Sequence, residues 1–179
     1  FNLKKNDDFG IFEIGMDKKG EIDHLSKIIK PDVGVITNIS QAHIKNFKNI
    51  NQIALAKSEI IGNIKEEGYL VLNHDDEFYN FHKKKALKRN LKILSFSLKN
   101  KSATVNLDSI IKEKNKYKIS ININKSKKYF YSSSFFENDL KNLLAAITII
   151  SIYKNMHKLD RNIFYDHKVI NGRGDIVKV

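Results

Sequence analysis

Hydrophobic positions follow one period in the first half of this chain and another in the second half. Before residue 98, short apolar runs typical of strands buried on both faces alternate with segments in which apolar residues recur every three or four positions, as they do on helices. We predict strands at 9–15, 33–37, 69–72 and 91–97, and helices at 20–30, 50–64 and 77–89. Strands joined by single helices pair in parallel, so this half predicts an α/β fold with a mostly parallel sheet and flanking helices.

After residue 98, apolar and polar residues alternate, most clearly at Tyr117, Ile119, Ile121 and Ile123. Strands at 104–112, 116–124 and 128–134 would form a small antiparallel β extension with one face in water. A strongly apolar helix at 140–153, a short helix around 160–166 and a final strand at 176–179 follow. We therefore divide the chain into a parallel α/β part (1–97), an antiparallel meander (98–135) and a helical part with a last strand (136–179).

Lys57 lies on the apolar face of the second predicted helix, in register with Ile50, Ile53, Ile60 and Ile64. A buried ammonium group needs a partner or loses its proton. A neutral lysine amine is a nucleophile that can capture carbon dioxide as a carbamate, and this anion could bind a hard metal ion beside a histidine and a carboxylate. The alternative is an ordinary lysine whose stem packs on the helix while its head reaches water.

Polar residues follow the first two predicted strands. Glu13 stands near the end of the first strand, Asn38 follows the second, and His43 lies just beyond it. The carboxyl ends of parallel strands face the ligand crevice in open α/β sheets, so these residues are expected at one edge. Glu13 could instead be satisfied by backbone N–H groups or a lysine. Near the end of the chain, Arg173 lies between two glycines that would let the backbone approach a ligand closely, unless it is a solvent-facing turn residue.

The formal net charge of +12 invites a nucleic-acid interpretation. The cations are almost all scattered lysines, whereas arginine is the usual residue for bidentate phosphate and base contacts, so we predict no nucleic-acid partner. The absence of cysteine excludes disulfides and thiolate metal sites, and fits a reducing compartment. No apolar run approaches the ~20 residues of a membrane span, and no signal-peptide pattern is present. We expect a cytoplasmic monomer.

Three stretches in order, 13–22 (EIGMDKKGEI), 36–43 (ITNISQAH) and 53–60 (IALAKSEI), followed by 142–146 (NLLAA) and 172–174 (GRG), resemble the central ATPase domain of the Mur ligases. The residue before His43 is Ala42, whereas the related amino-acid-adding and folylpolyglutamate ligases usually have an aspartate at this position. This feature and the Gly-Glu-Ile at 20–22 are most similar to the members that add D-Ala-D-Ala to UDP-MurNAc-tripeptide.

The resemblance implies ATP-dependent amide formation in peptidoglycan precursor synthesis, with ATP and Mg²⁺ as cofactors and UDP-MurNAc-peptide and D-Ala-D-Ala as partners. By that resemblance Glu13 and His43 would hold magnesium, and a carbamylated Lys57 would place a second ion near the acyl phosphate. Asn142 would meet the adenine, Asn38 would belong to the cofactor-binding residues, and Arg173 would contact the γ-phosphate. We expect Lys57 within a few ångströms of both Glu13 and His43.

The chain departs from the family pattern in three ways. It has no Gly-x-x-Gly-Lys-Thr/Ser phosphate loop, and neither the N-terminal nucleotide-sugar domain nor the C-terminal amine-binding domain is recognisable. Phe136, Asn138 and Asp139 stand where the family usually shows Gly-x-His-Asn. We therefore expect a partial domain that is inactive by itself. The alternatives are another Mur-type or folylpolyglutamate-like amino-acid ligase, and a non-catalytic binding module of the same fold.

Overall fold

The computed structural model describes residues 4–40, 46–133, 137–154 and 156–165. These residues form one six-stranded sheet with the strand order β1-β2-β3-β4-β5-β6. Strands β1 (Val33–Ile36), β2 (Tyr69–Asn73) and β3 (Lys92–Ser97) are parallel neighbours. The mostly parallel α/β half that the apolar pattern predicts is therefore confirmed.

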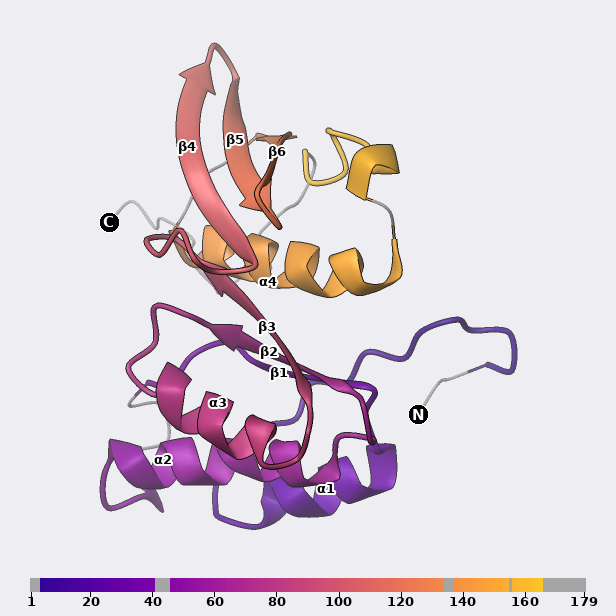
Figure 1. Cartoon of the computed structure of the whole chain (residues 1–179), viewed down its shortest axis with the longest axis vertical. Coiled ribbons are helices and arrows are strands. Elements are labelled where there is room, and N and C mark those ends of the chain that lie inside the picture. Colours follow the sequence, from indigo (N-terminus) through magenta and orange to yellow (C-terminus); the bar gives the residue numbers. More distant parts are fainter. Residues whose placement is uncertain (1–3, 41–45, 134–136, 155, 166–179) are drawn as a thin grey trace, which may run out of the picture.

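Helices cover both faces of this parallel part. Helices α1 (Glu21–Ile29), α2 (Ile50–Lys57) and α3 (Tyr79–Leu87) lie on one face, together with the 3-10 helix η2 (Ser58–Asn63), and α4 (Glu137–Tyr153) lies on the other (Figure 1). Strand β2 serves both layers, because Leu70 and Leu72 pack with the η2 and α3 side whereas Val71 packs with the α4 side. Burial on both faces explains why its sequence is a continuous apolar run.

The antiparallel meander consists of β4 (Val105–Glu113), β5 (Lys116–Ile123) and β6 (Ser126–Ser132). Strand β4 continues the sheet in parallel with β3 through two residue pairs, Phe96 with Val105 and Ser97 with Asn106. Ile119, Ile121 and Phe130 of the meander join the core beneath α4. The alternating pattern thus predicts these strands correctly, and α4 rests on both halves of the sheet.

The predicted strand at 9–15 is wrong. This segment pairs with no strand of the described sheet, and Ile11 is 97% exposed while Glu13 is also exposed. Phe12 and Ile14 are partly buried and lead into buried Met16, so only one face of the segment packs. An apolar run becomes a buried strand only where a neighbouring strand pairs with it, and apolarity alone does not supply that neighbour.

Two other segments differ from the sequence prediction. Residues 161–165 form turns because their backbone runs along β6, where the N–H of Tyr131 donates to the Arg161 carbonyl at 2.8 Å. The predicted helix at 50–64 changes at Ser58 into the tighter η2, and the Ser58 hydroxyl donates to the Leu55 carbonyl at 2.6 Å. A serine that bonds its own helix backbone in this way favours a local change of helix type. The predicted strand at 176–179 lies outside the described residues.

None of the described helices is long and apolar enough to cross a membrane. A 3-10 turn, η3 (Met156–Lys158), follows α4.

Candidate functional site

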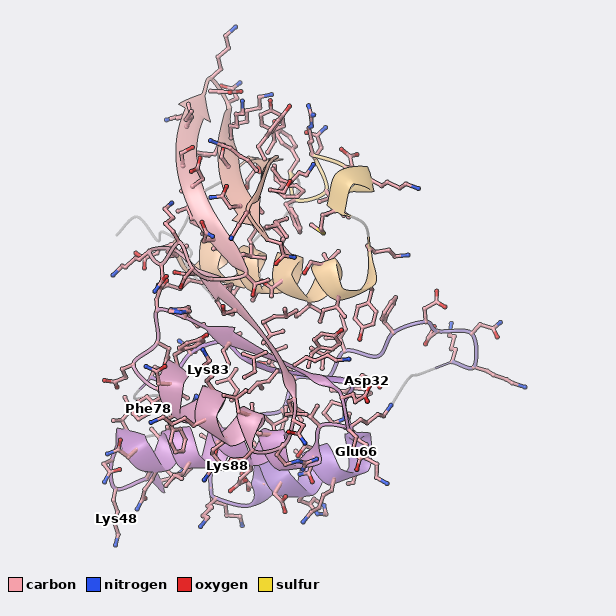
Figure 2. All side chains as sticks on the ribbon, in the orientation of Figure 1. Asp32, Lys48, Glu66, Phe78, Lys83 and Lys88 are labelled. Carbon is pink, nitrogen blue, oxygen red and sulfur yellow. The ribbon has the colours of Figure 1, made fainter. Side chains whose placement is uncertain are left out.

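The carboxyl ends of β1, β2 and β3 lie at one edge of the sheet because the three strands are parallel. Figure 2 shows the two ends: Asp32 and Glu66, which precede β1 and β2, lie at one end, and Phe78, which follows β2, lies at the other. Asn38 is exposed directly after β1, and Asp76 is half-buried after β2. This edge is where a doubly covered α/β sheet binds its ligand.

Lys57 is the last residue of α2, and it points toward this edge. Its Nζ atom donates to the backbone carbonyl of Asn38 at 2.9 Å, and its side chain is half-buried. Burial lowers the pKa of Lys57 below the usual lysine value, and the charge of Asp76 opposes that shift. The amine therefore has a partner, as a lysine on an apolar face requires, and that partner is a neutral carbonyl.

Local sequence fixes the helix that carries Lys57. The side chain of Asn49 caps α2 by accepting the N–H of Gln52 at 3.1 Å. Within the helix, Ile53, Ala54 and Ala56 form the buried face. Because the cap sets the start of the helix and the small and apolar residues set its buried face, Lys57 is placed at the margin of that face, beside the exit of β1.

Asp76 is a residue of this edge that the sequence pattern did not single out as a site residue. One carboxylate oxygen accepts the N–H of Ile39 at 2.7 Å and the other accepts the N–H of Phe78 at 2.9 Å. The bond to Phe78 is local, but the bond to Ile39 joins residues 37 positions apart. The signal that could have found it is an acidic pair placed directly after a buried strand.

His82 lies below Lys57 in the layer between α2 and α3. Its side chain is 1% exposed, and its Nε2 atom lies 3.2 Å from the Ala54 carbonyl oxygen, which can only accept, so Nε2 donates. Burial lowers the pKa of His82 below its usual range, while the Ala54 carbonyl and Asp76 act in the opposite direction. His82 is thus a neutral packing histidine at neutral pH.

The other predicted site residues are placed only in part. Glu13 is exposed, while its neighbour Ile14 packs against the same buried cluster as Ile39. Asn142 is exposed near the start of α4. His43 and Arg173 lie outside the described residues, so the expected contact of Lys57 with Glu13 and His43 stays a prediction. Among the described residues, no three histidine or carboxylate side chains are grouped as a metal site.

A sequence model of the Mur ligase middle domain matches residues 1–150. The chain belongs to the Mur ligase family. This membership confirms the resemblance that the motifs at 13–22, 36–43 and 53–60 indicate.

Two curated relatives of this Mur ligase middle domain have the same name. The UDP-N-acetylmuramoyl-tripeptide–D-alanyl-D-alanine ligase of Buchnera aphidicola subsp. Baizongia pistaciae is 30% identical over 148 residues, which are 83% of this chain and 32% of that protein. The enzyme of the same name from Borreliella burgdorferi is 39% identical over 102 residues, 56% of this chain and 22% of that protein. The chain spans no more than about a third of the length of these relatives.

Solved structures have the same fold. MurF from Acinetobacter baumannii superimposes with a TM-score of 0.85 at 23% identity, over 99% of this chain and 38% of that one. MurF ligase from Thermotoga maritima, solved in complex with ADP, gives a TM-score of 0.74 at 21% identity, over 90% of this chain and 36% of that one. The α/β sheet with its antiparallel extension is therefore the architecture of the Mur ligase middle domain.

Proposed function

We propose that this Mur ligase middle domain is the central part of an ATP-dependent ligase that adds D-Ala-D-Ala to UDP-MurNAc-tripeptide. The observation that carries the proposal is the half-buried Lys57 amine at the carboxyl edge of the parallel strands, hydrogen-bonded to Asn38. The shared name of the relatives, two of which are described above, supports the choice of substrates. We expect the whole protein to act as a cytoplasmic monomer.

The reaction has two steps. The terminal carboxylate of the tripeptide attacks the γ-phosphorus of ATP, which forms an acyl phosphate and releases ADP. The amine of D-Ala-D-Ala then attacks the acyl carbon, and phosphate leaves as the amide bond forms. Phosphoryl transfer of this kind depends mostly on positioning and on neutralising charge, so an edge lined by polar backbone groups and oxygen ligands suits it.

Lys57 is the residue on which this proposal depends. Burial already favours its neutral amine, which is the form that captures carbon dioxide. The described residues fit a magnesium site in part, because a carbamate on Lys57 would supply oxygen ligands and Glu13 is an exposed carboxylate. Magnesium would be held by Glu13, His43 and the carbamate of Lys57, and it would neutralise phosphate charge.

The remaining nucleotide contacts follow the family resemblance. Asn142 is exposed on α4, so its amide is available for an adenine, and Asn38 is exposed at the β1 exit. Arg173 would neutralise the γ-phosphate during transfer, as a guanidinium group does well because its fork of donors matches phosphate geometry. These roles belong to the whole ligase, of which this chain is about a third or less in length when compared with its relatives.

The test uses the chain together with the coding sequence that flanks it in its gene. Phosphate release from ATP is measured with UDP-MurNAc-tripeptide plus D-Ala-D-Ala and, separately, with UDP-MurNAc-L-alanyl-D-glutamate plus meso-diaminopimelate or lysine. We expect release only with D-Ala-D-Ala, and a loss of at least about a hundredfold in kcat for Lys57→Ala. Lys48→Ala is the control, because Lys48 is an exposed lysine just before α2 (Figure 2). Release driven by another amine would identify a different Mur-type ligase, and no release with any amine would indicate a non-catalytic module.

A further inference from the structure

One peptide group at the candidate site is held from both sides. The carbonyl of Asn38 and the N–H of Ile39 belong to the same peptide unit, which joins β1 to the segment that follows it. Lys57 donates to the carbonyl oxygen at 2.9 Å, and Asp76 accepts from the N–H at 2.7 Å. Because the described chain has no cis peptide, these two groups point in opposite directions, and the two side chains approach the unit from opposite sides.

The carboxylate of Asp76 is itself fixed in orientation. Its second oxygen accepts the N–H of Phe78 at 2.9 Å, and its backbone carbonyl accepts the N–H of Tyr79 at 3.0 Å. Asp76 therefore cannot turn without breaking contacts at the start of α3. A carboxylate bonded to a peptide N–H also polarises that peptide, which makes its carbonyl oxygen a stronger acceptor for the amine on the other side.

We propose that Asp76 is the positioning residue for Lys57, acting through the Asn38–Ile39 peptide. Asp76 sets the orientation of that peptide, and the peptide carbonyl sets the place of the Lys57 nitrogen. This inference rests on the proposed function, because the position of Lys57 matters for catalysis only if Lys57 serves the ligase reaction.

The same carbonyl can orient a carbamylated lysine. When the neutral amine attacks carbon dioxide, a nitrogen–carbon bond forms, one N–H proton goes to water, and one C=O electron pair becomes the carboxylate charge. The product keeps one N–H on Nζ, and this N–H can still donate to the Asn38 oxygen. Its two carboxylate oxygens then point away from the carbonyl, toward the open edge of the sheet.

The experiment compares Asp76→Asn, Asp76→Glu and Asp75→Asn in the full-length protein. Asp75 is a matched control, because it accepts the N–H of Leu98 at 2.7 Å and the Ser97 hydroxyl but does not touch the Asn38–Ile39 peptide. The first readout is independent of catalysis: limited acetylation with acetic anhydride, with Lys57 and the exposed Lys48 quantified by mass spectrometry. The second readout is kcat and KM for ATP in the phosphate-release assay.

We expect Asp76→Asn to increase acetylation of Lys57 relative to Lys48 by about threefold or more and to lower kcat about tenfold with little change in KM. Asp76→Glu keeps the charge and should recover part of both effects, while Asp75→Asn should leave both near the wild-type values. If Asp76→Asn leaves Lys57 acetylation unchanged, or changes it no more than Asp75→Asn does, the proposal is wrong. If acetylation responds as expected but the wild-type protein releases no phosphate with D-Ala-D-Ala, the positioning role stands and the proposed function fails.

Discussion

The carboxylate of Glu59 caps helix α1, whose N-cap residue Gly20 lies 39 residues earlier, by accepting the N–H of Gly20 through both oxygens at 2.9 and 3.0 Å. It also accepts the N–H of Asp23 at 3.2 Å. Gly20 is the N-cap position of α1 and has no side chain to cap with, and its φ of 92° suits glycine. The side chain of Glu59, in η2, therefore provides the N-cap that a serine or aspartate at the N-cap position usually provides.

Replacing Glu59 with alanine should destabilise the domain by about 1–2 kcal/mol, because three hydrogen bonds at the N-terminus of α1 are lost. The favourable interaction of the carboxylate with the positive end of the helix dipole is lost as well. Urea unfolding followed by circular dichroism measures the change. Glu66→Ala is the control, because Glu66 is an exposed turn glutamate (Figure 2) and its loss should cost less than about 0.5 kcal/mol. Equal costs for the two variants would show that the cap contributes nothing.

Gly68 leaves no room for a side chain. A Cβ atom there would lie 2.8 Å from the carbonyl oxygens of both Asp32 and Lys65, and 2.6 Å from a methyl carbon of Ile64. Backbone atoms cannot move away as a side-chain end can, so Gly68→Ala should cost about 2 kcal/mol or more in urea unfolding. Gly62→Ala meets nothing within 4 Å and should stay within about 0.5 kcal/mol of wild type. A Gly68→Ala protein as stable as Gly62→Ala would contradict the packing around β2.

His82 should make the domain sensitive to acid. Its folded-state pKa lies below the usual histidine value because of burial, so the unfolded chain binds the proton more readily than the folded one. The contribution of the neutral ring is therefore complete above the ordinary pKa of about 6.5 and is lost as the pH falls below it. Between about pH 7.5 and about pH 5, wild type should lose more unfolding free energy than His82→Gln. The exposed His24, replaced by glutamine, is the control for the substitution itself.

Lys57→Met should separate stability from activity. Methionine keeps the apolar stem and removes the amine, so the unfolding free energy at neutral pH should stay within about 1 kcal/mol of wild type while ligase activity is lost. Because the pKa of Lys57 is lowered in the folded state, the unfolded chain binds its proton more tightly, and wild type should gain stability relative to Lys57→Met as the pH rises toward the ordinary lysine value. Urea unfolding at about pH 7 and about pH 9.5 measures this, and an opposite trend would contradict the burial of the amine.

Local pattern predicts much of this fold because each element is buried in the way its period demands. β2 is apolar on both faces and is covered on both, and the alternating residues of β5 place Ile119 and Ile121 in the core. The segment 9–15 is also rich in apolar residues, yet it is not a strand, because strand formation depends on a pairing neighbour that composition does not reveal. The spacing of apolar residues shows which face of a helix or strand is buried, but it does not show which strand will pair with it.

The candidate site could be predicted only where the chemistry of a residue does not suit its position in the sequence pattern, such as a charged side chain on an apolar face. Lys57 is such a residue, since an ammonium group on an apolar face needs an explanation, and the structure gives it a partner at the β1 exit. Asp76 does not contradict its surroundings, because an aspartate after a strand is an ordinary helix cap, and its bond to Ile39 depends on folding. His82 is followed by Lys83, Lys84 and Lys85, a run typical of a solvated helix face, and its burial follows from the packing of α2 against it.

Helix α4 packs on a core that includes Val71 of β2, Phe96 of β3 and Ile121 of β5. Shifting the meander against the parallel strands would expose these side chains to water, at a cost of roughly 1.5–3 kcal/mol for each one. We therefore expect Asn142, carried on that helix, to keep its separation from the strand ends beside Lys57. Under the proposed function, we expect any closing movement that brings ATP, the acceptor carboxylate and the amine together to come from the connecting loops or from parts of the whole protein outside this core.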